Sequence, residues 1–307
     1  MKKLIFNVLL SISIFCEGQN TILNINPEND TIIVNSSISN YILNLSKKYI
    51  TTGTAHLSQT SILVDRYEFE LTDNQKYYVD TIMQCLIDSA VFDKLHALYF
   101  GFYGHDDQAA YQNWIGDYDN LTQINGDIYF LAKWGIKGTG LASGPCLTMQ
   151  STIKTICDSS KYSFGVFLEE HSTGVSFFNG AHNGVTLNWI MGYDAVSSGP
   201  YGYLNGSIIV YNFGSVPFMS GWSRNGTNCY GYKNGIQIGT DSDYPSPLPD
   251  YSMYILGRNN SNINQASYGG RISCFYISIH GIYLTANEHR AIYNTFIKWR
   301  NYVDAIF

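Results

Sequence analysis

The chain has 307 residues, enough for one large domain with an appendage or for two ordinary domains. Only 14% of its residues are charged and 45% are apolar, with 25 Tyr and 28 Gly, which argues against a disordered chain or a helical bundle and favours short strands joined by turns. The net charge of -6, with no basic run longer than a Lys pair, argues against nucleic acid as the main partner.

Residues 1–62 predict an N-terminal attachment arm. A Lys pair, an apolar run from Leu4 to Cys16 and a small Gly18 are typical of a secretory signal and too short to span a membrane. The same run would also suit a retained anchor that docks into a partner, and this is the interpretation we follow. Two alternating runs, Ile22–Ile25 and Ile32–Val34, then lie in an extended stretch rich in Asn and Ser, which is too polar to fold alone.

We expect residues 63–307 to form the folded domain, with an amphipathic helix near residues 72–90 at its start. Thr72 and Gln75 have the spacing of a capping box. Apolar residues then recur on one helical face, namely Val79, Ile82, Met83, Leu86 and Ala90. A buried strand is expected next, at about Ala97–Phe102.

From about residue 125 to 284 the segments are short and strand-like, and clusters of Gly, Asn, Ser and Pro separate them. The Asn-Gly pairs in residues 204–207 and 233–236 are flanked by strand formers and predict β-hairpins. Many antiparallel strands with few helices predict a mainly β fold, a β-sandwich.

The stretch HGIYLTANEH (280–289) places His280, Glu288 and His289 within ten positions, as a metal site would. Thr285 and Glu288 also have the spacing of a second capping box, which would occupy the Glu288 carboxylate and turn His289 to another side of the helix. Apolar residues follow at helical spacing, namely Ile292, Phe296, Trp299 and Val303. We therefore expect a helix near 286–303 that covers the sandwich, and no metal site.

No motif in the sequence assembles catalytic groups. There is no G-x-S-x-G, no H-E-x-x-H and no phosphate-binding glycine loop. Glu169 and Glu170 are adjacent and fall on opposite faces of a strand, whereas a glycosidase needs two carboxylates about 5 to 9 Å apart across a cleft. The six cysteines are scattered, and we expect thiols because Cys85 and Cys274 lie in apolar patterns. The sequence therefore predicts no enzyme.

The loop GTDSDYPSP (239–247) holds the strongest candidate binding groups. Asp241 and Asp243 share a side of this oxygen-rich loop, so calcium is the cation that would fit, although a plain turn is the simpler interpretation and we expect no cofactor. Aromatic side chains near the loops would stack on sugar rings, unless the strand alternation buries them. The predicted ligand-binding residues are Trp222, Tyr232, Asp241, Asp243 and Tyr244.

The order of features resembles structural proteins of tailed bacteriophages. The segment IMQCLIDSAVFDKLHALYFGFYGHDDQAAYQNWIG (82–116) combines a helix, a K-L-x-A-L-Y strand and A-A-x-x-N-W, and YKNG, GRISCFYISIHGIYLT and E-x-x-x-I-Y follow later. In that family such a segment precedes a concanavalin A-like (laminin G-like) jelly-roll domain. The resemblance covers about residues 63–305 and carries over no catalytic residue.

The resemblance implies a non-enzymatic virion protein, a head or tail fibre-like appendage. Its partners would be other virion proteins, further copies of itself and a host-surface glycan. The signal-like start keeps a second interpretation open, a secreted bacterial carbohydrate-binding (lectin-like) protein outside the cell. A polysaccharide hydrolase or lyase on the same fold is the third alternative.

Overall fold

The computed structural model describes residues 12–16, 19–26, 31–35, 57–67, 70–101, 107–141, 143–171, 176–182, 188–194, 199–204, 207–210, 216–265 and 268–306. The chain divides into two compact units, Met1–Ala55 and His56–Phe307.

The first unit contains a three-stranded antiparallel sheet in the order β1-β2-β3. Its strands are β1 (Ile12–Cys16), β2 (Gln19–Asn26) and β3 (Thr31–Asn35). The two alternating runs predicted in the arm form β2 and β3, and the end of the apolar run forms β1. This part of the arm is therefore a small sheet rather than an extended connector, because the three β-prone runs pair their backbones with one another.

The second unit begins at His56, so the boundary predicted at residues 62 and 63 falls inside helix α1 (Ser58–Val64). The backbone N–H of Leu57 donates to the Asp80 carboxylate at 2.9 Å. Leu63 is fully buried among the apolar residues of the following helix. These contacts make α1 part of the folded domain. The sequence prediction assigned its first residues to the arm because the segment around them is polar.

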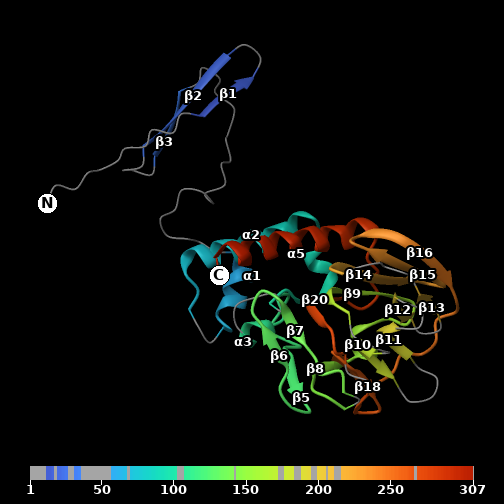
Figure 1. Ribbon diagram of the computed structural model, residues 1–307. Helices are drawn as coiled ribbons and strands as arrows, with labels where there is room; N and C mark the ends of the chain where they lie inside the picture. Colours follow the sequence, from blue (N-terminus) through green and yellow to red (C-terminus); the bar gives the residue numbers. More distant parts are fainter. Residues whose placement is uncertain are drawn as a thin grey trace. The chain divides into compact units, whose positions relative to one another are not determined.

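Two β-sheets face each other across the main core of the second unit (Figure 1). One sheet, called here the helix-covered sheet, has the order β16-β15-β14-β9-β20-β7-β6, with β4 also paired to β20. Its strands are β4 (Leu95–Tyr99), β6 (Tyr129–Leu131), β7 (Gly135–Lys137), β9 (Lys161–Glu170), β14 (Phe218–Asn225), β15 (Asn228–Lys233), β16 (Ile236–Ser242) and β20 (Arg271–Ser278).

The second sheet has the order β13-β12-β11-β10-β17-β8-β5, extended by β18 and β19 beside β10. Its strands are β5 (Thr122–Ile124), β8 (Cys146–Thr152), β10 (Ser176–His182), β11 (Asn188–Asp194), β12 (Gly199–Leu204), β13 (Ser207–Val210), β17 (Ser252–Ile255), β18 (Arg258–Asn260) and β19 (Ile263–Gln265). The strand pairs are antiparallel apart from β10 with β18. The predicted mainly β sandwich is confirmed.

Helices α2 (Asp73–Asp88) and α5 (Ala286–Ile306) pack side by side on the outer face of the helix-covered sheet (Figure 1). The capping box of α2 is present as predicted: Thr72 Oγ1 accepts from the Gln75 N–H at 3.3 Å, and Gln75 Oε1 accepts from the Thr72 N–H at 2.8 Å. The four predicted apolar residues of α5 are at most 8% exposed. Both flanking helices are therefore confirmed, and within the described ranges the other short helices after α1 are η2 (Phe92–Lys94), α3 (Asp107–Ala110) and α4 (Ile153–Ile156).

Strand β9 separates two apolar cores, because its side chains alternate between the faces of the sheet. Phe164 and Leu168 point into the main core between the sheets. Phe167 points outward and packs against Phe296 of α5, with ring centroids 4.9 Å apart. The central strands of the helix-covered sheet, β9, β14 and β20, are thus buried on both faces, which explains their long runs of buried residues.

The hairpin predicted at Asn234-Gly235 joins β15 and β16, and both turn residues have positive φ, 52° and 73°. A Cβ at Gly235 would lie 2.2 Å from the Arg290 backbone, so only glycine lets this turn approach α5. In the other predicted hairpin β12 pairs with β13 as expected, and its turn residues lie outside the described residues.

The strand expected at about Ala97–Phe102 is observed as β4 (Leu95–Tyr99), and Phe102 lies outside the described residues. Cys85, Cys146, Cys157, Cys229 and Cys274 are free thiols. Among the helices in the described part of the chain, none combines the length and the apolar character that crossing a membrane requires.

Candidate functional site

Two of the predicted ligand-binding aromatics are buried, so the prediction that they form an exposed surface is wrong. Trp222 is 0% exposed and stacks on Phe164 between the sheets, with ring centroids 6.0 Å apart. Tyr232 is 3% exposed and stacks on His289 of α5 at 4.3 Å. The alternation along β14 and β15 turns these rings to faces that the second sheet and α5 cover.

The other three predicted residues lie together on the surface at one end of the sandwich. Asp241 and Asp243 are exposed, and Tyr244 is 81% exposed. Asp241 lies near the end of β16, and Asp243 and Tyr244 begin the end loop, residues 243–251, which leads from β16 of the helix-covered sheet to β17 of the second sheet. Their role in ligand binding remains a prediction.

Hydrogen bonds to the backbone hold both ends of the end loop in place. The Asp243 N–H donates to the Thr227 carbonyl, and the fully buried Arg224 donates from Nη1 to the Asp243 carbonyl, both at 2.9 Å. At the far end, the Ile153 N–H donates to the Tyr251 carbonyl at 3.0 Å. The loop is therefore positioned without a ligand, which lowers the entropy cost of binding.

A pocket of about 680 Å³ opens under this loop. Its lining comes from three parts of the chain: the α4 region, the end loop and the segment after β20. The residues are Lys154, Cys157, Asp158, Ser159, Pro247, Leu248, Pro249, Asp250, Tyr251 and His280. This volume lies within the range of small-molecule sites, roughly 300–1,000 Å³.

Charged groups on one part of the lining are held by local partners. Lys154 Nζ lies 3.7 Å from Asp250 Oδ2, and Asp250 Oδ1 accepts from Thr152 Oγ1 at 2.9 Å. Asp158 Oδ1 accepts from the N–H and the Oγ of Ser160, at 2.6 and 2.7 Å. These two hydrogen bonds lower the pKa of Asp158, although burial opposes them, so the pocket presents an ionised carboxylate at neutral pH.

The lining also contains apolar surface. Leu248 and Pro249 are buried, while Tyr251 is half-buried and packs against the main core. Burial raises the pKa of the Cys157 thiol, so this group is protonated at neutral pH and a poor nucleophile. The pocket therefore offers apolar contact, hydrogen bonds and fixed charge.

The two aspartates predicted to suit calcium serve the backbone of their own loop. The Ser242 N–H donates to Asp241 Oδ1 at 2.8 Å, and the Tyr244 N–H donates to Asp243 Oδ1 at 2.7 Å. Such bonds are typical of turns. Among the described residues, no group of three or more His, Cys, Asp or Glu side chains is placed to hold a metal ion. Calcium at this loop stays a prediction.

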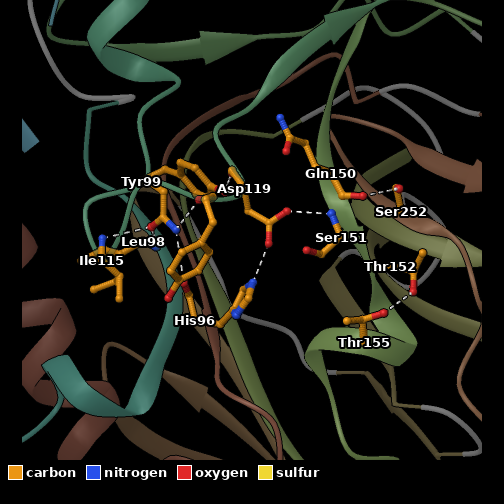
Figure 2. A network of polar contacts seen from close by, with 12 residues as sticks. His96, Leu98, Tyr99, Ile115, Asp119, Gln150, Ser151, Thr152, Thr155 and Ser252 are labelled. Atoms are coloured by element: carbon orange, nitrogen blue, oxygen red, sulfur yellow. Dashed lines mark hydrogen bonds and ion pairs between the residues drawn. The ribbon is translucent and has the colours of Figure 1, made fainter. Parts of the chain in front are cut away.

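Figure 2 shows a second polar network, centred on Asp119. The Asp119 carboxylate lies 2.6 Å from His96 Nε2 and accepts from the Ser151 backbone N–H at 2.6 Å. His96 lies on β4 of the helix-covered sheet and Ser151 on β8 of the second sheet, so the carboxylate ties the two sheets together. Ser151 bonds the carboxylate itself, whereas in a catalytic triad the imidazole stands between the serine and the carboxylate, so the arrangement fits a structural tie.

The Asn-Trp pair in the segment that resembles phage proteins is also structural. The Asn113 side chain accepts from the N–H groups of Leu98 and Ile115 and donates to the carbonyls of His96 and Tyr118. Trp114 is 1% exposed and meets Trp299 of α5 edge to face, with ring centroids 5.0 Å apart. These contacts explain the motif without a ligand.

His289 belongs to a network of buried polar side chains. Its Nε2 lies 2.8 Å from Ser223 Oγ, and its Nδ1 lies 2.5 Å from Tyr276 Oη. Glu288 accepts from the Thr285 N–H at 2.6 Å, as predicted for the cap, and also pairs with Lys94. The Thr285 hydroxyl donates to Glu288 instead of accepting from the backbone.

No family model and no curated protein matches the chain. Among solved structures, domain 4 of an extracellular arabinanase from Geobacillus stearothermophilus, in complex with arabinotriose, is 15% identical, with a TM-score of 0.47 over 64% of this chain and 97% of that one. The binding domain of botulinum neurotoxin serotype D is 10% identical, with a TM-score of 0.48 over 67% of this chain and about half, 52%, of that one. A sialidase carbohydrate-binding module from Ruminococcus gnavus, bound to sialyllactose, is 11% identical, with a TM-score of 0.37 over 51% of this chain and 96% of that one.

Sequence reasoning missed most of the pocket. Lys154, Asp158, Tyr251 and His280 meet there, although they lie in three separate parts of the chain. The sequence does carry one signal, since the Pro-rich stretch after Asp243 continues directly into the lining. Only the pairing of strands reveals that the turns before β9 and after β20 reach the same end of the sandwich.

Proposed function

We propose that the second unit is a non-enzymatic glycan-binding module and that the pocket under the end loop is its site. The observation that carries this proposal is a preformed pocket that combines apolar and charged groups. A sugar ring has an apolar face of C–H groups and an edge of hydroxyls that both donate and accept. Tyr251 and Leu248 suit the face, whereas Asp158, Asp250 and Lys154 suit the hydroxyls.

Protonation supports binding over hydrolysis. A glycosidase needs one carboxyl group kept protonated as an acid, which requires a raised pKa. The hydrogen bonds from Ser160 lower the pKa of Asp158 instead. An ionised carboxylate accepts hydrogen bonds from hydroxyls well and donates a proton poorly.

A glycan-binding module fits an extracellular location, and the signal-like start from Leu4 to Cys16 would deliver it there. The virion interpretation rests on the sequence resemblance, and the motif residues Asn113 and Trp114 are explained by packing alone. We therefore favour the secreted lectin-like interpretation. Native material would then lack residues 1–18, whereas an intact N-terminus in its mass spectrum would favour the retained anchor.

The binding proposal is tested on an array of immobilised neutral and acidic oligosaccharides. Lys154→Gln and Asp250→Asn each remove one charge at a side chain that is 65% exposed, so the fold should be unchanged. We expect each variant to lose about fivefold or more in affinity for the glycans that the wild-type chain binds.

Asp127→Asn, at an exposed turn, is the matched control and should bind as the wild type does. Full binding by both pocket variants would contradict the proposed site. Release of new reducing ends from a bound glycan would contradict the non-enzymatic part.

A further inference from the structure

A second surface, far along the chain from the end loop, presents an exposed indole ring. Trp134 is 58% exposed, whereas Trp114, Trp222 and Trp299 are at most 8% exposed. Trp134 lies in the turn between β6 and β7, and Tyr129 and Leu131 of β6 are 63% and 38% exposed beside this turn. Exposed clusters of large apolar side chains commonly mark binding surfaces.

The turn holds the backbone of Trp134 in a fixed place. The Trp134 N–H donates to the Leu131 carbonyl at 2.8 Å, and Lys133 and Gly135 have positive φ, 64° and 95°. A Cβ at Gly135 would lie 2.2 Å from the Ile272 carbonyl oxygen, so only glycine brings the turn this close to β20. The position of Trp134 is therefore built into the sheet.

A row of charged residues crosses the sheet beside this ring. Lys137 of β7 pairs in register with Tyr129 of β6 and with Arg271 of β20, and Arg271 pairs with Glu170 of β9. Residues paired in this way point to the same face of a sheet. The Arg271 guanidinium lies over the Trp134 ring, 5.1 Å from its centroid.

Positive charge exceeds negative charge in this row. Glu170 is the single carboxylate, and it pairs with Arg271 Nε at 2.7 Å and with Lys137 Nζ at 3.2 Å. Lys133 precedes Trp134 in the turn and adds a third cation. A guanidinium has five N–H donors and an ammonium has three, so both retain donors after binding one carboxylate.

Glu169, the neighbour of Glu170 on β9, is surrounded by Arg271 of the row and by Arg300 and Asp304 of α5. Glu169 is 5% exposed at its side chain, accepts from Ser273 Oγ at 2.6 Å and lies 3.3 Å from Arg300 Nη1. Four cations, Lys133, Lys137, Arg271 and Arg300, stand against the three carboxylates of Glu169, Glu170 and Asp304, so one excess positive charge remains on a chain whose net charge is -6. The surface therefore favours an anionic ligand.

We propose that Trp134, Lys137 and Arg271 form a second carbohydrate site, which binds a pyranose ring that carries a carboxylate. The apolar face of the sugar stacks on the indole, and its carboxylate accepts hydrogen bonds from Lys137 and Arg271. A hexuronate and a sialic acid share this chemistry. This site does not depend on the pocket under the end loop.

The test uses tryptophan fluorescence of the full chain, with a galacturonate hexamer and sialyllactose as acidic probes and cellohexaose as the neutral probe. An acidic probe should shift the emission to shorter wavelength and protect the indole from acrylamide, and added salt should weaken the effect. Trp134→Phe should abolish the emission change, and Trp134→Ala should weaken binding by at least roughly tenfold. Whichever acidic probe binds more tightly identifies the class of sugar.

Lys137→Gln, at a side chain that is 36% exposed, should remove the preference for the acidic probe over cellohexaose. Equal binding of acidic and neutral probes, or wild-type affinity in Trp134→Ala, would overturn the proposal. If Trp134→Ala does not fold, protection of the wild-type indole by the probe decides instead. Loss of binding in Lys154→Gln alone would place the sugar in the pocket and refute this second site.

Discussion

Acidification should destabilise the protein through His289. The imidazole is 1% exposed, and burial lowers its pKa from 6.5 to about 3. Ser223 Oγ donates to the Leu284 carbonyl, so it accepts from the N–H at Nε2 of His289, and Nδ1 accepts from Tyr276 Oη. Protonation would turn Nδ1 into a donor and remove the acceptor of the Tyr276 hydroxyl.

The sign follows from the two pKa values. The unfolded chain takes up a proton below pH 6.5 while the folded chain does not, so the stabilisation is complete above 6.5 and is lost as the pH falls from 6.5 towards 3. One pKa unit corresponds to about 1.4 kcal/mol, so at about pH 5 the loss amounts to about 2 kcal/mol of the free energy of unfolding. The lowered pKa values of Asp119 and Glu288 add their losses at lower pH, below their ordinary values of 3.8 and 4.5.

Urea unfolding near pH 7 and at about pH 5 measures this decrease in the free energy of unfolding. His289→Gln keeps a donor and an acceptor but cannot titrate. We expect this variant to have a free energy of unfolding about 1–3 kcal/mol below that of the wild type near pH 7. Its further decrease on going to about pH 5 should be smaller than in the wild type by about 2 kcal/mol. His280→Gln, at an exposed histidine, should follow the wild type. The same pH dependence in wild type and His289→Gln would refute the reasoning.

Three further predictions concern packing. Phe296→Ala, at a fully buried ring, should lower the free energy of unfolding by about 3–5 kcal/mol. Asn294→Ala, at an exposed position of the same helix, is the control and should change it by less than about 0.5 kcal/mol. Similar urea midpoints for the two variants would contradict the two-core arrangement. A chain that starts at His56 should unfold cooperatively, because it contains the whole second unit. A chain that starts at Asp65 lacks α1, and its free energy of unfolding should be lower by about 2 kcal/mol or more. Equal melting temperatures for the two chains would show that α1 is not part of the folded domain. Trp222→Ala should lose about 3–5 kcal/mol, and an unchanged melting curve would show that its ring is not part of the core.

Local features of the fold were predictable because their causes lie within a few residues of one another. Thr72 and Gln75 satisfy each other across one helical turn, and Asn234-Gly235 adopts a turn that few other pairs allow. The apolar spacing of α5 identified its buried face for the same reason. Element types and the mainly β class follow from such short-range patterns.

The direction of a strand residue depends instead on what covers each face of its sheet. Alternation shows that neighbouring residues on β14 face opposite ways, but not which face meets the second sheet. Trp222 therefore gave the same signal as an exposed aromatic would. Trp134 sits in an apparently ordinary turn, and it is exposed because β6 is the edge strand beside it.

The candidate sites themselves were decided by tertiary structure alone. Lys154, Asp250 and His280 line one pocket because strands from both sheets end there, and no spacing along the chain encodes that meeting. Likewise, Lys137, Arg271 and Glu170 form one row only through the register of three paired strands. The sequence by itself determined which residues prefer helix, strand or turn, whereas the pairing of distant strands decided which side chains lie together in each candidate site.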